Sequence, residues 1–330
     1  MVNLEGLELN RYPDPKQLEV KALLAEMRGV RPEQIFVGVG SDEAIDLLIR
    51  IFCKPGEDAI IVTPPTYGMY KVCAKINDVR IQQVPLTPDF NVVVPEILRA
   101  ATPSSKLLFL CSPGNPTGKT VPALIIREIM QGGFDGIVVV DEAYCDFSGK
   151  ESACSLIDEL DRVVVLQTLS KAFGMAAIRG VQGGRGGGGG AGMGFAYANE
   201  NIIQYMNNVK APYNVNRLSQ EVAVRALSDR TLYEERVATI LKERKRLQEA
   251  LRRFSFVKEV KESEANFFLV EVDRAQEIYK RMADNGVVVR FRGNELHCKD
   301  CLRVTVGTVE ENNRLLELLE ETVAAISVAS

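Results

Sequence analysis

Short apolar runs alternate with amphipathic stretches over the first two-thirds of the chain. This alternation is typical of an α/β domain with a mainly parallel sheet. Several of the runs are unbroken in β-branched residues or leucine, as expected for strands that are covered on both faces. The stretches at 42–52 and 123–130 have the apolar spacing of helices. The predicted strands are residues 35–39, 59–62, 80–84, 107–111, 137–140 and 163–167.

The pattern changes after about residue 216, where a long helical stretch rich in charged residues occupies 232–254. The simplest account of what surrounds this helix is a small α+β domain. The other predicted helices in this part are 218–228, 275–285 and one from residue 309 onward. The predicted strands are 266–272, 287–290 and 302–306.

Residues 180–194 differ from both flanks, because ten of these fifteen residues are glycine. Such a composition buries no apolar surface and loses much conformational entropy on ordering. The glycines are not spaced as in the dinucleotide-binding G-x-G-x-x-G pattern, and a single arginine, Arg185, gives little support for RNA contact. We interpret the tract as a flexible insert.

The overall composition limits the possible partners. Hydrophobic residues make up 46% and charged residues 25% of the 330 residues, which are ordinary values for a globular protein. A formal net charge of −4 gives no reason to expect nucleic acid as a partner. No stretch approaches the roughly 20 apolar residues that cross a bilayer, and the first residues lack the pattern of a secretory signal. We therefore expect a soluble, cytoplasmic protein with no membrane or nucleic-acid partner.

The chain has one histidine, His297, and this limits the chemistry available to it. A Ser–His–Asp triad or a two-histidine metal site would have to use this residue, so proton transfer is better sought from lysine, tyrosine or a carboxylate. Cys298 and Cys301 form a C-x-x-C motif beside it, but three ligands fall short of the four that a structural zinc site uses. The other five cysteines are expected to be reduced core thiols.

Polar side chains follow three of the predicted strands. Asn115 lies in the loop after 107–111, Asp141 comes directly after 137–140, and Lys171 follows 163–167. Ligands bind outside the carboxyl ends of the strands in an open parallel sheet, so these three side chains can converge on one crevice. Each also has an ordinary explanation, as a turn residue, a helix cap or a solvated lysine. Their combination favours a functional site.

Pyridoxal phosphate needs such a set of groups. A lysine amine forms a Schiff base with the cofactor, and a carboxylate keeps the pyridine nitrogen protonated. Asparagine and tyrosine can donate to the phenolic oxygen, and Tyr67 is either a ring-stacking residue or a core tyrosine. The phosphate favours a helix N-terminus, hydroxyls and an arginine. The candidates for that end are Ser41, Asp42, Thr168, Ser170 and Arg179.

These motifs resemble the fold type I, class II pyridoxal-phosphate-dependent aminotransferases and, more narrowly, the histidinol-phosphate aminotransferases. The resemblance covers nearly the whole chain outside the glycine tract. It implies a large domain of residues 16–214 with a mainly parallel seven-stranded sheet, and a small α+β domain of residues 215–330 that includes 1–15 as the remnant of an N-terminal arm. The segments that carry it are 9–15, 40–43, 112–118, 141–144, 170–174 with Arg179, 210–214 and 301–307.

The resemblance also implies a role for each candidate residue of the cofactor site. Lys171 would form the Schiff base, and Asp141 would hold the pyridine nitrogen. Asn115 and Tyr144 would contact the phenolic oxygen, and Tyr67 would stack on the ring. The phosphate site would be lined by Ser41, Asp42, Thr168, Ser170 and Arg179.

Substrate and partner follow from the same resemblance. Tyr12 would reach the active site of a partner subunit, which implies a homodimer with shared sites. Arg303, together with Arg290, would bind the anionic end of the substrate. The reaction would be reversible amino transfer between L-histidinol phosphate and 2-oxoglutarate.

Two features depart from the family pattern. Family members begin earlier, with an arm that helps to close the active site, whereas only eleven residues precede Tyr12 here. The family also runs almost directly from the arginine at position 179 into the strand at 194–198, and the glycine tract interrupts this step. Our hypothesis is that the tract is a gene-model error such as a retained intron, which sequencing of the mature transcript would test.

Alternatives remain on the sequence alone. An aminotransferase for aromatic or acidic amino acids, or a threonine-phosphate decarboxylase, would share the cofactor residues. A non-catalytic descendant would explain the short arm and the insert, although the retained Lys171 and Asp141 argue against it. A nicotinamide-dependent dehydrogenase lacks the spaced glycine fingerprint after its first strand.

Overall fold

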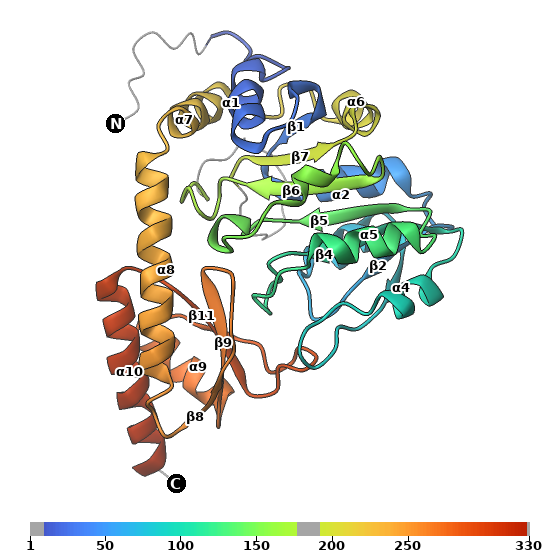
Figure 1. Ribbon diagram of the computed structural model, residues 1–330. Helices are drawn as coiled ribbons and strands as arrows, with labels where there is room; N and C mark the ends of the chain where they lie inside the picture. The colour runs from blue at the N-terminus through green and yellow to red at the C-terminus, as the bar shows by residue number, and fades with distance from the viewer. Residues whose placement is uncertain (1–9, 177–191, 329–330) are drawn as a thin grey trace.

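A seven-stranded sheet forms the centre of the larger domain, with helices on both of its faces (Figure 1). The structure is a computed structural model that describes residues 10–176 and 192–328. The strand order is β1-β7-β6-β5-β4-β2-β3; β7 is antiparallel to both neighbours and the other pairs are parallel. The predicted α/β class with a mainly parallel seven-stranded sheet is confirmed. The strands are β1 (Ile35–Gly38), β2 (Ala59–Val62), β3 (Arg80–Gln83), β4 (Ser105–Cys111), β5 (Ile137–Asp141), β6 (Val163–Thr168) and β7 (Gly194–Ala198).

The central strands bury both faces, because successive side chains point to opposite sides of a strand. In β5, Val138 and Val140 belong to one core and Val139 to the other. The first core lies beneath α1 (Leu18–Arg28), α4 (Val94–Ala100), α5 (Ala123–Gln131) and α7 (Arg217–Ser228). The second lies beneath α2 (Gly40–Phe52), α3 (Met69–Ile76) and α6 (Glu200–Val209). The described residues of this part also form short 3₁₀ helices at Pro32–Gln34, Cys145–Phe147 and Ala153–Leu156.

A long helix, α8 (Thr231–Leu251), runs from the larger domain to a second, smaller sheet (Figure 1). This antiparallel sheet has the order β10-β11-β9-β8. One face packs on α8, α9 (Ala275–Asp284) and α10 (Val309–Val328), and the other looks towards the larger domain. Its strands are β8 (Val257–Val260), β9 (Phe267–Val272), β10 (Arg290–Phe291) and β11 (Cys301–Thr305). The domain boundary after residue 214 stays a prediction.

The strand predicted at 287–290 is largely wrong. Val287 is held at the end of α9 by the hydrogen bond that its backbone N donates to the oxygen of Met282, 3.0 Å away. Pairing with β11 begins at Arg290, so that residues 287–289 have no ladder partner. Their β-branched composition reflects burial of Val289 rather than membership of the sheet.

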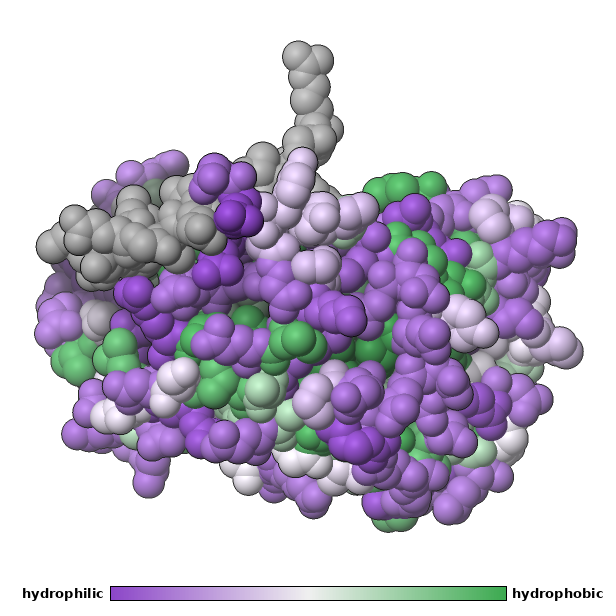
Figure 2. All heavy atoms as spheres, turned by 90° about the horizontal axis from the view of Figure 1, so that it is seen from above, coloured by the Kyte–Doolittle hydropathy of each residue, from purple (hydrophilic) through white to green (hydrophobic). Residues whose placement is uncertain are grey.

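Seen from above, most of the molecular surface is hydrophilic, and the hydrophobic residues gather in small patches (Figure 2). Of the helices within 10–176 and 192–328, none is long and apolar enough to cross a bilayer.

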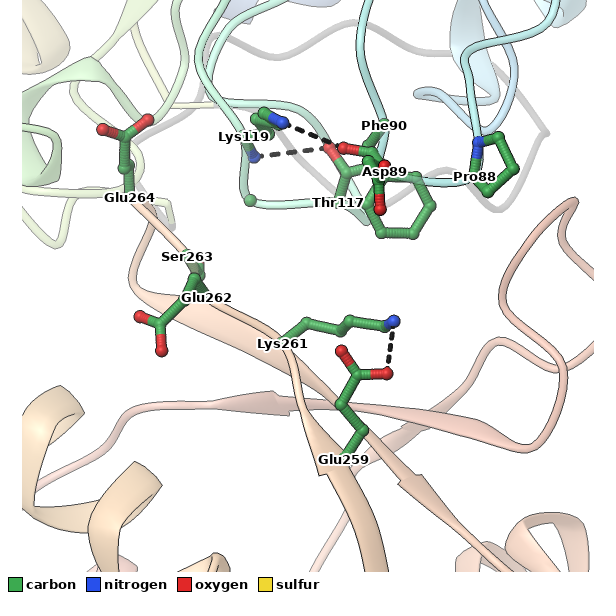
Figure 3. Close-up of a pocket in the computed structure, with 11 residues that line it drawn as sticks. Pro88, Asp89, Phe90, Thr117, Lys119, Glu259, Lys261, Glu262, Ser263 and Glu264 are labelled. Carbon is green, nitrogen blue, oxygen red and sulfur yellow. Dashed lines mark hydrogen bonds and ion pairs between the residues drawn. The ribbon is translucent and has the colours of Figure 1, made fainter.

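The two domains meet beside a groove of about 510 Å³ (Figure 3). Residues 88–90 and 117–119 line it from the larger domain, and residues 259 and 261–264 line it from the smaller one. Next to it, the backbone N of Glu264 donates to the oxygen of Gly118 at 2.7 Å. Gly118 has φ +72°, and a Cβ there would lie 2.1 Å from the hydroxyl of Ser263. Glycine is therefore required both by the backbone conformation and by the close approach of the domains.

Candidate active site

The carboxyl ends of β4, β5 and β6 lie side by side and carry the residues that the sequence singled out. Lys171 follows β6, and its Nζ lies 5.3 Å from the centre of the Tyr144 ring, which follows β5. Asn115, after β4, accepts a 2.6 Å hydrogen bond from Nη1 of Arg303 on β11. The structure thus brings Lys171, Tyr144, Asn115 and Arg303 to the space between the two domains.

Asp141 is the last residue of β5, and its carboxylate is 2% exposed. Oδ2 accepts a 2.6 Å hydrogen bond from the Tyr70 hydroxyl, and Oδ1 accepts one from the backbone N of Ala143 at 3.2 Å. Burial raises the pKa of Asp141 to about 6, although these two bonds oppose the shift. A cation beside the carboxylate would restore its ionised form.

Tyr70 is a functional candidate that the sequence analysis missed. It is fully buried in α3, and its ring stacks on Phe109 with a centroid distance of 4.6 Å. Its partner Asp141 lies 71 residues further along the chain, so no local motif joins the two. The available signal was the helical spacing of Tyr70, Cys73 and Ala74, which places all three on the face of α3 that meets the sheet.

The Lys171 amine lies in an environment that favours its neutral form. Burial lowers the pKa of Lys171, and the positive charge of Arg303 lowers it further, against the opposing carboxylates of Asp141 and Asp42. A neutral amine is the form that acts as a nucleophile or accepts a proton. Among the described residues, its Nζ forms no ion pair and no hydrogen bond with a side chain.

Tyr67 lies next to this group. Its hydroxyl donates to Oδ1 of Asp42 at 3.1 Å, and its ring meets the edge of Tyr70 with centroids 5.6 Å apart. Burial raises the pKa of Asp42, with the Tyr67 bond opposing the shift. The predicted stacking residue and one predicted phosphate residue are therefore in direct contact.

The predicted phosphate residues gather around the start of β7. Gly194 packs so closely on the first turn of α2 that a Cβ would lie 2.3 Å from the backbone N of Ser41. The Thr168 hydroxyl donates to that of Ser170 at 2.8 Å, and Ser170 Oγ accepts from the backbone N of Gly192 at 2.6 Å. The N-cap of α2, Val39, offers no side-chain acceptor, so an anion can meet the N–H groups there. Arg179 and residues 180–191 of the glycine tract lie outside the described residues.

The three predicted substrate residues are placed differently. Arg303 is half-buried, with its guanidinium 4.8 Å from the ring centre of Phe267. Arg290 lies directly opposite Arg303 in the sheet and is exposed. Tyr12 is 80% exposed and stacks on Tyr213 at 4.4 Å, so its ring is available to a second molecule.

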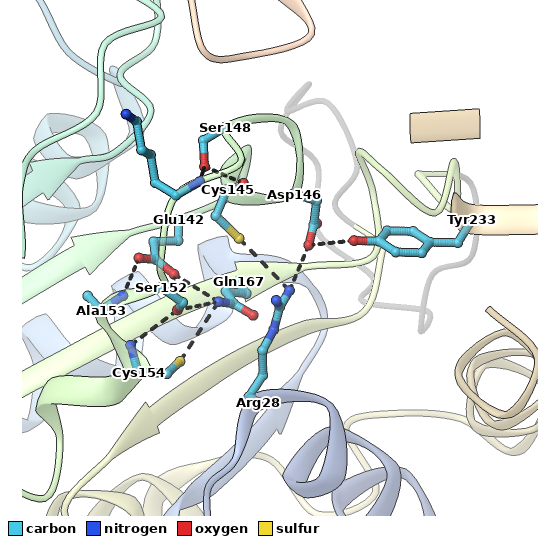
Figure 4. Close-up of polar contacts among 11 residues, drawn as sticks. Arg28, Glu142, Cys145, Asp146, Ser148, Ser152, Ala153, Cys154, Gln167 and Tyr233 are labelled. Atoms are coloured by element: carbon cyan, nitrogen blue, oxygen red, sulfur yellow. Dashed lines mark hydrogen bonds and ion pairs between the residues drawn. The ribbon is translucent and has the colours of Figure 1, made fainter. Parts of the chain in front are cut away.

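A second layer of polar contacts holds the loop after β5 (Figure 4). Glu142 accepts hydrogen bonds from Ser152, from the backbone N of Ala153 and from Gln167. Unlike its neighbour Asp141, this carboxylate is saturated with donors, so its role is structural. Asp146, in the same loop, is bonded by Arg28 at 2.8 Å and by Tyr233 of α8 at 3.0 Å.

His297 and the two cysteines of the C-x-x-C motif lie apart from this site, whereas Cys111 lies within it, opposite Asp141 in the sheet. His297 Nε2 is 3.2 Å from the oxygen of Leu86, and Cys298 and Cys301 are buried. All seven cysteines are free thiols. Within 10–176 and 192–328, no three His, Cys, Asp or Glu side chains are grouped as a metal site would need.

Comparison with known proteins decides the family. The sequence matches "Aminotransferase class I and II" over residues 3–319. The chain belongs to the class I and II aminotransferases. Among curated relatives, a histidinol-phosphate aminotransferase of Flavobacterium johnsoniae is 44% identical over 312 residues, which are 94% of this chain and 85% of that protein. The resemblance stated from the motifs is thereby confirmed.

Solved structures show the same fold for this aminotransferase. The histidinol-phosphate aminotransferase of Sinorhizobium meliloti, in complex with pyridoxal-5'-phosphate, has a TM-score of 0.84 and 24% identity, covering 98% of this chain and 85% of that one. The L-threonine-O-3-phosphate decarboxylase of Porphyromonas gingivalis has a TM-score of 0.79 and 21% identity, covering 97% and 93%. Fold type I is confirmed, and it is shared by enzymes of different activity.

The described residues of this aminotransferase fit pyridoxal phosphate. The buried carboxylate of Asp141 has no cation within 4.0 Å in the described part of the chain, and a protonated pyridine nitrogen would supply one. Lys171 offers an amine whose charged form is disfavoured by burial, which lowers its pKa. The residues predicted to stack on the ring and to bind the phosphate come from the start of α2 and the adjoining strand ends.

Removing the Tyr70 hydroxyl tests its part in the site. Tyr70→Phe is expected to lower the free energy of unfolding by about 1–3 kcal/mol, because it removes a buried hydrogen bond to a charged group. The lost bond favours the ionised carboxylate of Asp141, so the acid limb of the pH–rate profile should move to higher pH. Urea unfolding and transamination rates between pH 5 and 9 measure both effects, with Tyr279→Phe as the control. An unmoved acid limb would argue against the role.

Proposed function

We propose that this aminotransferase transfers the amino group of L-histidinol phosphate to 2-oxoglutarate, giving imidazole acetol phosphate and glutamate in histidine biosynthesis. The observation that carries the proposal is the Arg303 guanidinium, which reaches from the small domain to Asn115, at the same edge of the sheet as Tyr144 and Lys171. It offers an anion-binding group opposite an amine, in a chain that is 44% identical to a histidinol-phosphate aminotransferase. The chemistry of these groups suits an amino donor with an anionic far end.

Each residue near the cofactor has a proposed task. Bound pyridoxal phosphate supplies a carbonyl that takes up the amino group and a ring that accepts electrons from the substrate's α-carbon. Lys171 would hold the cofactor covalently until the donor's amino group displaces it, and its freed Nζ would then move the proton between two carbon atoms. Asp141 keeps the proton on the ring nitrogen. Asn115 and Tyr144 donate to the phenolic oxygen, and Tyr67 covers the ring.

The phosphate of the cofactor is proposed to lie at the start of α2. Its oxygens would accept from backbone N–H groups there and from nearby hydroxyls, with an arginine to balance the charge. The proximity of Gly194 to both α2 and the Thr168–Ser170 turn supports this placement. The proposed residues are Ser41, Asp42, Thr168, Ser170 and Arg179.

The substrate end is proposed to be shared between two subunits. Arg303 and Arg290 would bind the substrate phosphate, and Tyr12 would reach the site of the partner in a homodimer. The 80% exposure of Tyr12 supports this, because such an aromatic ring gains from being covered by a second molecule. The reaction is proposed to take place in the cytoplasm.

The visible absorbance spectrum of the purified protein tests the proposal. The band of the bound cofactor should bleach on addition of L-histidinol phosphate and return on addition of 2-oxoglutarate. A band that responds only to L-phenylalanine or L-aspartate would indicate another aminotransferase, and carbon dioxide release from O-phospho-L-threonine would indicate a decarboxylase. A band that responds to none of them would indicate a non-catalytic protein.

A further inference from the structure

Three arginines share one face of the small sheet. Arg290 of β10 lies opposite Arg303 of β11. Leu302, the neighbour of Arg303, packs into the core beneath the helices, so the Arg303 side chain lies on the opposite face, towards the larger domain. Arg292 follows Arg290 by two residues, and its backbone N donates to the oxygen of Cys301 at 2.8 Å, which continues the pairing. The side chains at 290, 292 and 303 therefore emerge on the face that looks onto the cleft.

This arrangement gathers positive charge without a counter-ion. Like charges directly opposite each other in a sheet are unfavourable. In the described part of the chain, no carboxylate oxygen lies within 4.0 Å of Arg290, Arg292 or Arg303 to offset the repulsion. Burial lowers the pKa of Arg303, and the charges of Arg292 and Arg290 lower it further. An anionic ligand would complete the cluster.

Two of the arginines also have unused donors. The Nε atoms of Arg292 and Arg303 are buried and have no hydrogen-bond partner among the described residues. Arg303 already gives Nη1 to Asn115, which leaves its Nε for a ligand. A buried donor without an acceptor destabilises the folded protein, because it has lost its hydrogen bonds to water. A phosphate has three oxygens and two negative charges, so it can accept from several guanidinium groups at once and balance more than one arginine.

The cluster adjoins the reactive amine through two aromatic rings. The Arg303 guanidinium lies 4.8 Å from the centre of Phe267, Phe267 lies 4.9 Å from Tyr144, and Tyr144 lies 5.3 Å from Lys171 Nζ. Burial raises the pKa of Tyr144 to about 12, and the charges of Arg303 and Arg292 partly offset that rise. An amino donor whose amino group lies next to Lys171 would thus extend towards Arg303 and Arg292.

We propose that Arg292 is a specificity-determining residue that acts with Arg290 and Arg303 to make the cleft prefer amino donors ending in a dianionic phosphate. The inference rests on the proposed function and adds to it a residue that the motifs did not indicate. Arg292 binds the phosphate end and takes no part in the proton transfer. Its contribution is therefore to the binding of the phosphate donor rather than to the chemical step.

Steady-state kinetics of the holoenzyme and its Arg292→Gln variant test this inference with two donors, L-histidinol phosphate and L-histidinol. The variant is expected to raise KM for L-histidinol phosphate by about 10- to 100-fold, the range of a charge-assisted hydrogen bond, with kcat changed less than about threefold. The kcat/KM for L-histidinol should stay the same, because this donor has no phosphate. Arg253→Gln, at an exposed arginine beyond the end of α8, is the matched control and should change neither donor.

The outcomes separate the inference from the proposed function. A KM for L-histidinol phosphate that does not change in Arg292→Gln would overturn the inference. Equal loss of kcat/KM for both donors would overturn it as well, because it would mark Arg292 as a structural residue. A wild-type enzyme that turns over neither donor would overturn the proposed function itself, and the inference with it.

Discussion

Lys171→Ala is expected to lower transamination by at least about 10,000-fold, because loss of a nucleophile that acts within a catalytic unit has effects of that order. The fold should persist. Burial disfavours the Lys171 ammonium, and within 10–176 and 192–328 its Nζ has no ion pair whose loss would destabilise the protein. The measurements are single-turnover rates with L-histidinol phosphate and thermal unfolding followed by circular dichroism.

Lys245→Ala is a matched control for this variant, because Lys245 is an exposed lysine on α8. It should keep normal turnover and keep the cofactor through dialysis, whereas Lys171→Ala should release the cofactor. Near-normal transamination by Lys171→Ala would show that another group carries the cofactor.

Asp141→Asn is expected to reduce kcat by about 100-fold or more, the size of effect seen when one preorganised electrostatic partner is removed. Asparagine is nearly isosteric, so that Tyr70 and Ala143 keep their places while the negative charge is lost. The measurement is kcat with saturating cofactor and L-histidinol phosphate. Unchanged kcat in a variant that retains the cofactor would exclude Asp141 as the partner of the ring nitrogen.

The same substitution has a pH-dependent effect on stability in the cofactor-free protein. Burial raises the pKa of Asp141 from 3.8 to about 6, so the native state holds this proton over a pH range in which the unfolded chain has released it. The contribution of Asp141 to the free energy of unfolding is therefore fully present below about pH 4. It is lost as the pH rises through 6, by ~3 kcal/mol in total. Asparagine does not titrate, so the free energy of unfolding of the variant should rise relative to that of the wild type between pH 4 and 7. A difference in urea unfolding that is independent of pH would contradict this.

The centre of the fold follows from the sequence because its strands are buried on both faces. The side chains of β2, β4, β5 and β6 are apolar on both faces of the strand, which favours central strands of a sheet covered by helices on both sides. These strands begin and end within two residues of the prediction. The strand predicted at 287–290 fails because a valine-rich run near a helix end can be buried without pairing. Apolar composition indicates that a segment is buried, whereas strand pairing depends on which backbone segment lies next to it.

The position of Asn115, Asp141 and Lys171 at neighbouring strand ends was predictable, because each follows an apolar run of the sequence. Tyr70 and Arg292 were not, because each takes its meaning from contacts between distant segments. Tyr70 matters through a bond to Asp141 across 71 positions, and Arg292 through its place beside a strand that begins nine residues later. Arg179 lies outside the described residues, so its role rests on the resemblance alone.

Gly118 fixes the width of the cleft through the absence of a side chain. Asn115 and Arg303 come from different domains, and Asn115 Oδ1 lies 2.6 Å from Arg303 Nη1. Gly118, where the two domains are in close contact, lies three residues after Asn115. Any larger residue there would meet Ser263 and move the small sheet outward, carrying the arginines away from Lys171. The length of donor that fits between the amine and the arginines is therefore set partly by a residue that touches no substrate. A change of substrate in such enzymes can thus begin with a substitution at the contact between the domains, while every residue of the reaction centre stays the same.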